Sequence, residues 1–186
     1  MLHHFLKAKS FVPSEFHDSF FDIDFQTLYQ QGYRYIITDL DNTLISYQET
    51  LPTDQIITTF QELKDMGYEL VLLSNNHPER IRVFCEGLDV NGFANARKPL
   101  LYGINKAFFS MKDAVKEQTL IIGDQLVTDI FGANRFGVYN ILVNPLKKKT
   151  EKWYTKMNRK LERKMLDKIK RQLPKTYEQL GLEGRK

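Results

Sequence analysis

Short apolar runs alternate with amphipathic stretches along the chain, and this alternation predicts strands separated by helices. The runs are bounded by polar residues, which is typical of buried strands, and they cover residues 33–40, 69–76, 119–125 and 138–145. Apolar residues recur at three- and four-residue steps between the runs, which predicts helices over residues 51–68, 77–88, 99–114 and 126–137. Two further segments have weaker patterns: one or two short amphipathic helices over residues 16–33, and a short strand or loop over residues 92–99.

Strand and helix signals alternate through most of the first 146 residues, with connections long enough for crossover helices. Connections of this kind favour right-handed crossovers and parallel pairing of the strands. The expected class is therefore α/β, with a mainly parallel sheet. The chain has 186 residues, which is enough for one domain with a sizeable core.

Carboxylates stand where the predicted strands end. Asp39 and Asp41 close the first strand, Asp124 closes the third, and Asp129 follows five residues later. Because open parallel sheets bind ligands at the carboxyl ends of their strands, we expect these four side chains to converge on one rim. Clustered carboxylates raise one another's pKa values, and a divalent cation removes the repulsion. Mg²⁺ is the expected ion, because it takes oxygen ligands from one or two carboxylates together with phosphate oxygens.

A hydroxyl group, an amide and an ammonium group are expected at the same rim. Ser74 and Asn75 end the second strand, and Lys98 precedes a predicted helix, with Arg97 as the neighbouring alternative. A hydroxyl donor and a fixed positive charge suit a phosphoryl group. With one carboxylate free to attack and another to move protons, this set of residues describes phosphoryl transfer through an aspartyl-phosphate.

The order and spacing of these motifs resemble those of the haloacid dehalogenase (HAD) superfamily of phosphatases. "DLDNTL" (39–44) is similar to the first motif, a hydrophobic strand plus DxDxT, and "LLSNN" (72–76) to the second, a strand plus serine. The lysine of "ARKP" (96–99) and the stretch "IIGDQLVTD" (121–129) are similar to the third and fourth. The resemblance implies a HAD-like Rossmannoid fold with three α/β/α layers.

The resemblance also implies a role for each residue of the first motif. Asp39 would attack phosphorus as the nucleophile and would belong to the ligand set of the metal. Asp41 would protonate the leaving oxygen and then deprotonate the attacking water, with its backbone carbonyl touching Mg²⁺. Thr43 would help to position Asp41.

The other three motifs would bind the phosphoryl group and the metal. Ser74 would donate a hydrogen bond to the phosphoryl group, with the backbone of Asn75 beside it. Lys98 would neutralise the nucleophile and the phosphate. Asp124 would ligate Mg²⁺ directly, and Asp129 would do so through water.

The spacing of the motifs leaves no room for an inserted cap domain, which many members of this superfamily carry. About 30 residues separate Asp41 from Ser74, and about 24 separate Ser74 from Lys98. The predicted strand and helix use nearly all of these residues. We therefore expect a capless site that is open to a large substrate or to one held at a surface.

A narrower resemblance is to the subfamily IIIA group called the YqeG family, which includes the mitochondrial phosphatidylglycerophosphate phosphatases. It rests on "FVPSEF" (11–16), "YIITDLDNTL" (35–44), "GDQLVTDI" (123–130), the basic "MNRKLERKML" (157–166) and the absent cap. It implies that the substrate is phosphatidylglycerophosphate, a step of phospholipid biosynthesis whose products are phosphatidylglycerol and phosphate.

The charge divides the chain into a phosphatase domain over residues 1–146 and a basic extension over residues 147–186. The extension has 15 Lys and Arg against 5 Asp and Glu, whereas the preceding residues have 12 against 18. An apolar stripe at helical spacing runs through the extension, which predicts an amphipathic helix with Trp153 near its start; the stripe comprises Tyr154, Met157, Leu161, Met165, Ile169 and Leu173. Such a helix can bind an anionic membrane surface, bind nucleic acid, or simply pack on the domain.

Two other functions compete with a lipid phosphatase. One is a HAD phosphatase of a soluble or macromolecular phosphomonoester, such as a phosphoprotein or a nucleic-acid end, with the tail binding nucleic acid. The other is a binding module that has lost activity, which the intact pair Asp39 and Asp41 argues against. We expect a cytoplasmic protein, or one peripheral on the inner membrane face, because the sequence shows neither a signal peptide nor a long apolar run and has a single cysteine, Cys85.

Overall fold

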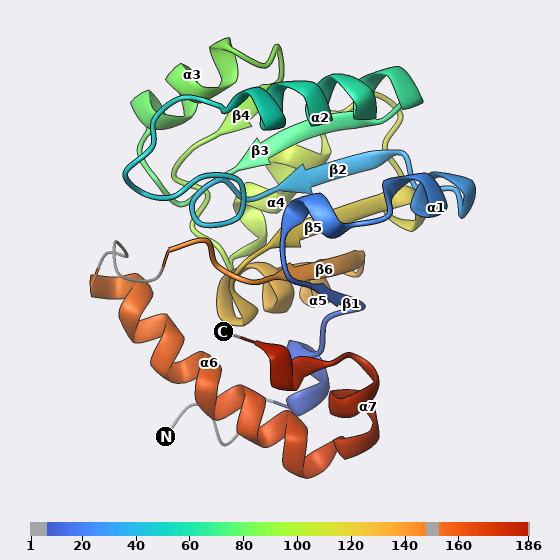
Figure 1. The fold of residues 1–186 in the computed structure, drawn as a ribbon, viewed down its shortest axis with the longest axis vertical. Coiled ribbons are helices and arrows are strands. Elements are labelled where there is room, and N and C mark those ends of the chain that lie inside the picture. Colours follow the sequence, from blue (N-terminus) through green and yellow to red (C-terminus); the bar gives the residue numbers. More distant parts are fainter. Residues whose placement is uncertain (1–6, 148–152, 186) are drawn as a thin grey trace.

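The computed structural model describes residues 7–147 and 153–185, apart from the side chains of Trp153 and Tyr154. The expected contribution of these two side chains to the tail, and the part of the tail over residues 148–152, therefore lie outside the described residues. Strands and helices alternate through the described chain, as the sequence predicts (Figure 1).

One six-stranded sheet forms the centre of the fold, and each pair of neighbouring strands is parallel. The strands lie in the order β1–β6–β5–β2–β3–β4 and comprise β1 (Glu15–His17), β2 (Tyr35–Thr38), β3 (Glu69–Leu73), β4 (Asn91–Phe93), β5 (Thr119–Gly123) and β6 (Tyr139–Val143). The predicted α/β class and parallel sheet are confirmed. The chain winds outward from β2 on one side and from β5 on the other, so the strand order reverses between these two central strands.

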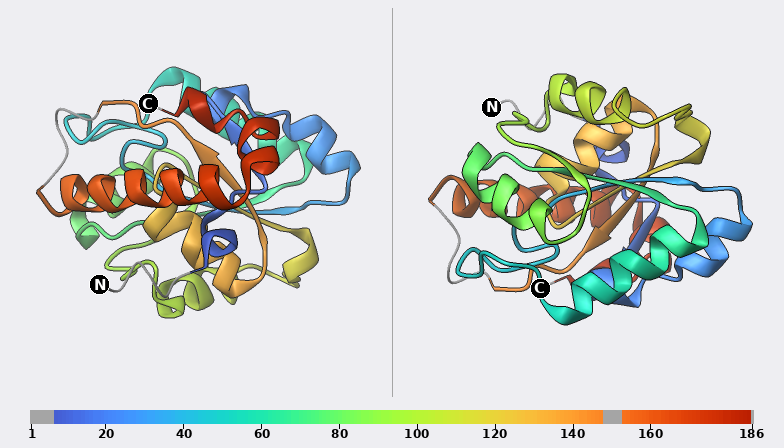
Figure 2. Two further views of the ribbon diagram at one scale, coloured as in Figure 1. Left: turned by 90° about the horizontal axis from the view of Figure 1, so that it is seen from below. Right: turned by 90° about the horizontal axis from the view of Figure 1, so that it is seen from above.

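Helices cover both faces of the sheet and give the three expected layers (Figures 1 and 2). One face carries α1 (Phe25–Gln30), α2 (Asp54–Met66) and α3 (Pro78–Glu86), and the other carries α4 (Leu101–Phe108) and α5 (Phe131–Phe136). Neighbouring residues of a strand point to opposite faces. Accordingly, Ile36 of β2 packs in the first apolar cluster and Ile37 packs in the second.

The sequence signals that bound α2 act as predicted. The side chain of Thr53 accepts a hydrogen bond from the backbone N–H of Ile56 at 3.3 Å, so it caps one of the free N–H groups at the helix start. Gly67 ends the helix with φ of 102°, a left-handed conformation that glycine adopts without steric cost. The chain can therefore leave α2 at Gly67 and enter β3 at Glu69.

The N-terminal segment differs from its prediction. Residues 16–33 were expected to be helical, but they include part of β1, the 3₁₀ turn η3 (Phe20–Asp22) and α1. β1 has three residues and pairs only with β6, more than 120 residues away in the chain. Three residues are too few to show the alternating pattern of a strand, so the sequence gives no local signal for β1. Its pairing with β6 stabilises it instead. Other short elements are η2 (Ala8–Phe11), η4 (Lys116–Gln118), the π-helical turn η5 (Leu126–Ile130) and η7 (Leu182–Gly184).

The register of the central strands brings their carboxyl ends to one level. Thr38, the last residue of β2, pairs with Leu72 on one side and with Ile122 on the other. Asp39 and Asp124 consequently leave the sheet at the same rim, next to the residue that follows β3, Ser74. This rim also lies where the strand order reverses, which is where open α/β sheets form binding sites.

The C-terminal residues form α6 (Trp153–Gln172) and α7 (Pro174–Gln179), which lie along the β1 and β6 edge of the sheet (Figure 1). The apolar stripe of α6 packs inward: Met165 and Ile169 are buried in a third cluster with Leu126 and Leu142. Of the alternatives for the stripe, packing on the domain is therefore what the structure shows. Met157 departs from the prediction, since its side chain is 59 % exposed.

No helix among the described residues is long and apolar enough to cross a membrane. In the described chain, β2, β3 and β4 are joined only by α2, α3 and loops, so the absence of an inserted cap domain is confirmed over this stretch.

We predict that α6 unfolds together with the domain. Ile169→Ala would remove a fully buried side chain and should lower the free energy of unfolding by about 2–5 kcal/mol. Urea denaturation would show this as a lower midpoint with an unchanged slope. Met157→Ala, at an exposed position of the same helix, is the control and should change the free energy by no more than about 0.5 kcal/mol. Coincident curves for Ile169→Ala and the unchanged protein would show that α6 is not part of the cooperative unit.

Candidate active site

Three carboxylates meet at the rim of the sheet. Asp39 follows β2, Asp124 follows β5, and Asp129 lies in the π-helical turn η5. One oxygen of each lies within 4.8 Å of the others, and all three side chains are buried. Gly123 makes this approach feasible, because a Cβ atom at this position would lie 2.4 Å from the carboxyl carbon of Asp129.

Burial and mutual repulsion change the proton affinity of this cluster. Burial raises the pKa of Asp39 well above its usual range, and the charges of Asp129 and Asp124 raise it further, against the opposing effect of Lys98. Burial likewise raises the pKa of Asp124 to about 6, although Arg159 opposes the shift. A positive charge placed among these oxygens opposes both shifts, because it stabilises the ionised carboxylates.

Lys98 supplies such a charge. Its Nζ lies 2.6 Å from Asp39 Oδ1 and 2.7 Å from Asp129 Oδ1, so it bridges the two carboxylates. Burial lowers the pKa of Lys98, but these two carboxylates together hold it above its usual value. The neighbouring Arg97 is exposed, so the structure places Lys98 at the site and leaves Arg97 outside it.

Asn75 fixes the backbone of Lys98. Its Oδ1 accepts a hydrogen bond from Lys98 N at 2.7 Å, and its Nδ2 donates to Lys98 O at 3.2 Å. The sequence suggested a contact between the Asn75 backbone and phosphate, whereas the side chain holds the loop that carries the lysine.

Thr43 also differs from its expected contact: its hydroxyl donates to Asp39 Oδ2 at 3.2 Å, so it orients the first aspartate of the motif instead of the second.

The carboxylate of Asp41 is not part of the three-carboxylate group and has its own hydrogen-bond partners. Its Oδ1 accepts a hydrogen bond from Arg80 Nε at 2.7 Å, and its Oδ2 accepts from Ser74 Oγ at 3.2 Å and from Asn76 Nδ2 at 3.1 Å. Asn76 and Arg80 are not among the residues that the sequence predicts for the site. Asn76 stood beside the predicted pair in "LLSNN", but Arg80 gave no signal beyond its place in the first turn of a helix that begins at this rim.

The donor set fits a hard divalent cation. Asp124 Oδ2 pairs with Arg159, while among the described residues Asp124 Oδ1 has no hydrogen-bond partner, although it is fully buried. Buried carboxylate oxygens almost always have a hydrogen-bond partner, so an oxygen without one, on a residue clustered with two other carboxylates, is suited to a metal ion. Asp39, Asp124 and Asp129 are the side chains that could hold the ion, and the side chain of Asp41 lies outside this group.

A roof covers the site, so the expectation of an open pocket is wrong. Tyr47 from the loop after β2 shares a hydrogen bond of 3.2 Å with Thr155 of α6, and Asn158 of α6 donates to Gln125 at 3.2 Å. These four residues line the pocket together with Asp39, Asp41, Ser74, Asn75, Asn76, Lys98 and Thr128, and its volume is about 40 Å³. The sequence excluded an inserted cap, but it gave no sign that the tail itself returns to the rim.

Comparisons with known proteins identify the family of the chain. The family model described as "Mitochondrial PGP phosphatase" matches residues 1–146. The chain is 38 % identical over 163 residues to a Bacillus subtilis (strain 168) protein described as "Probable phosphatase YqeG", with 88 % of this chain and 94 % of that protein covered.

A crystal structure of an uncharacterized protein from Listeria monocytogenes serotype 4b has a related fold. Its TM-score is 0.51 at 20 % sequence identity, and the match covers 62 % of this chain and 83 % of that one. At this identity the likeness concerns the fold alone. The family model and the curated relative carry the assignment, because together they span the sheet, the carboxylate rim and most of α6. The chain therefore belongs to the mitochondrial PGP phosphatase family and is a phosphatase.

Proposed function

We propose that the protein hydrolyses a phosphomonoester through an aspartyl-phosphate on Asp39, and that its substrate is the lipid phosphatidylglycerophosphate. The observation that carries the chemistry is the buried group formed by Asp39, Asp124 and Asp129 with Lys98 among them. An arrangement of this kind supplies a nucleophile, ligands for a cation and a fixed positive charge at one point.

The contacts of Asp39 suit a nucleophile. Lys98 binds Oδ1 and Thr43 binds Oδ2, so both oxygens are oriented before substrate arrives. Positioning of the attacking group accounts for much of the rate in phosphoryl transfer, because the reaction needs little other covalent chemistry from the protein. The ammonium group of Lys98 would also offset the negative charge that gathers on the phosphoryl oxygens.

Asp41 is placed for proton transfer. Arg80, Ser74 and Asn76 fix its carboxylate at the wall of the same pocket that Asp39 lines. From there Asp41 would give a proton to the leaving oxygen and later take one from water. Ser74 would reach the phosphoryl group from the same wall, since its hydroxyl lines the pocket beside Asp41.

We further propose that Mg²⁺ is the ion of this site. Asp39, Asp124 and Asp129 would hold it, with the backbone carbonyl of Asp41 as an additional ligand. When bound, Mg²⁺ would neutralise charge on the phosphoryl oxygens.

The outer face of α6 supports a substrate held at an anionic surface. Its exposed charged residues are almost all basic: Lys156, Lys160, Arg163, Lys164, Lys170 and Arg171, against Asp167. The inner face of the same helix lines the pocket through Thr155 and Asn158. Because a helix with its side chains is about 10–12 Å across, a lipid headgroup beside α6 would lie close to the site. Peripheral binding to an anionic membrane would thus bring substrate and enzyme together.

A soluble or macromolecular phosphomonoester is the second candidate. The same basic face of α6 would neutralise the phosphates of a nucleic acid, so charge alone does not separate the two. The family description, which names a PGP phosphatase, favours the lipid.

We predict that Asp39→Asn abolishes turnover. The amide cannot attack phosphorus, so phosphate release should fall by at least about four orders of magnitude. The assay is phosphate release from phosphatidylglycerophosphate in mixed micelles with Mg²⁺, beside a panel of soluble phosphomonoesters. Asp65→Asn, an equivalent change at an exposed position of α2, should leave the rate unchanged. Substantial activity in Asp39→Asn would refute the assignment of the nucleophile.

Removal of divalent cations should stop the reaction reversibly. Treatment with a chelator would leave the carboxylates to repel one another and the phosphate, and Mg²⁺ should then restore the rate. Full activity after chelation and dialysis would exclude a metal requirement. Circular dichroism of the treated protein would establish that the fold is retained.

We predict that the basic face of α6 determines activity on lipid but not on soluble esters. Changing Lys156, Lys160, Arg163 and Lys164 together to Gln removes four exposed charges and no buried contact. At roughly 1 kcal/mol per charge, binding to anionic vesicles should weaken by about 10²- to 10³-fold. Cosedimentation with anionic and neutral vesicles measures this, with RNA as a competitor. Equal loss on soluble esters, or RNA binding in preference to vesicles, would favour the second candidate.

A further inference from the structure

The C-terminal helix reaches the metal ligands through Arg159. Its guanidinium group pairs with Asp124 Oδ2, and its Nη1 donates to the backbone O of Asp124 at 2.7 Å. One side chain from α6 therefore binds the carboxylate and the backbone of the same residue. Both Arg159 and Asp124 are buried, so solvent does not weaken the contact.

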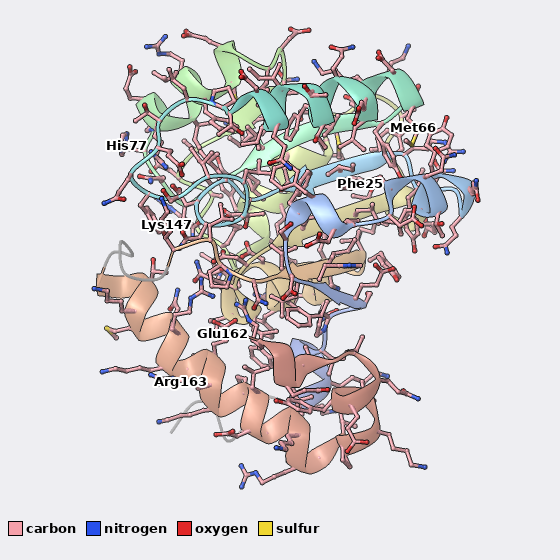
Figure 3. The ribbon with its side chains drawn as sticks, viewed as in Figure 1. Phe25, Met66, His77, Lys147, Glu162 and Arg163 are labelled. Carbon is pink, nitrogen blue, oxygen red and sulfur yellow. The ribbon has the colours of Figure 1, made fainter. Side chains whose placement is uncertain are left out.

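Two other charged residues fix Arg159 in this position. Glu162, one turn further along α6, accepts a hydrogen bond from Arg159 Nη1 at 2.8 Å. Its other oxygen accepts from the backbone N of Leu126 at 3.1 Å and pairs with Arg185 Nη2 at 2.7 Å. Arg185 also donates to the backbone O of Asp124. Figure 3 labels Glu162 on the side of α6 that faces the body of the protein.

The contact between α6 and Asp124 is made by buried charged side chains, although packing of the helix would not require them. Burying ion pairs costs desolvation energy, and well-packed apolar side chains hold a helix equally well. Further along, α6 does pack with apolar side chains, Met165 and Ile169. The buried or pocket-lining polar side chains described on α6 are Thr155, Asn158, Arg159 and Glu162, which precede the apolar Met165 and Ile169 along the helix.

We propose that Arg159 is a positioning residue for the metal ligand Asp124, and that α6 thereby completes the active site. Arg159 holds Oδ2, and this leaves Oδ1, which lacks a hydrogen-bond partner in the described chain, available to an ion in the group formed with Asp39 and Asp129. Partners that bind the second oxygen of a ligating carboxylate restrict its orientation, and their loss typically weakens metal binding 10- to 100-fold. This inference rests on the proposed function, because it assumes that the carboxylates bind Mg²⁺.

The residues of α6 that line the pocket lie next to Arg159 in the chain. Thr155 and Asn158 line the pocket from the turn of α6 that precedes Arg159. In this chain without an inserted cap, α6 thus both lines the pocket and orients a ligand of the metal.

The test is calorimetric titration with MgCl₂ in the absence of substrate. For Arg159→Ala, the dissociation constant should rise by about 10- to 100-fold relative to the unchanged protein. Arg171→Ala is the matched control, since it makes the same change at an exposed position of the same helix and should leave the constant unchanged. Circular dichroism of each metal-free variant shows whether the fold is retained, so that weaker Mg²⁺ binding can be attributed to the altered metal ligand.

Arg159→Lys replaces the alanine variant if that variant fails to fold. Lysine keeps a positive charge beside Glu162 but lacks the fork that reaches Asp124 Oδ2 and Asp124 O together, so a similar loss of affinity is expected. Unchanged or tighter Mg²⁺ binding in a folded Arg159 variant would overturn the inference and leave the proposed function standing. Absence of Mg²⁺ binding in the unchanged protein would instead overturn the metal assignment itself, and this inference with it.

Discussion

The repulsion among the buried carboxylates at the end of the sheet is the constraint that the rest of the site satisfies. Three cations neutralise the four carboxylates: Lys98 bridges Asp39 and Asp129, Arg80 pairs with Asp41, and Arg159 pairs with Asp124. These cations come from three separate parts of the chain, namely the turn before α4, α3 and α6. The fold therefore brings opposite charges to one rim, where unpaired carboxylates would otherwise stay protonated.

The sequence predicted the parts of the fold that carry a local signal. The central strands have continuous apolar runs, the ends of α2 have a capping threonine and a glycine, and the motif residues follow strands directly. Because the register of parallel strands aligns their carboxyl ends, the meeting of Asp39 with Asp124 followed from these signals. The separation of the motifs likewise excluded an inserted domain.

What the sequence did not predict depends on contacts between distant segments. β1 forms by pairing with the edge of β6, and the pocket is covered because Thr155 of α6 contacts Tyr47 at the rim. Arg159 is one of many basic residues in the tail, and nothing local distinguishes it from Arg163, which is exposed. Only the direction of each side chain from the packed helix separates a residue that orients a ligand from one that faces solvent.

The distance along the chain between Asp124 and its partners sets an order of assembly during synthesis. Arg159 follows Asp124 by 35 residues, and Arg185 follows it by 61. At ribosomal rates of about 5–20 residues per second, roughly 3–12 s pass between translation of Asp124 and of Arg185. The sheet can form within that interval, yet the carboxylate of Asp124 has no guanidinium partner until Arg159 is translated, and Glu162 lacks Arg185 until the interval ends. Catalytic competence would therefore arrive last, after the body of the domain has folded.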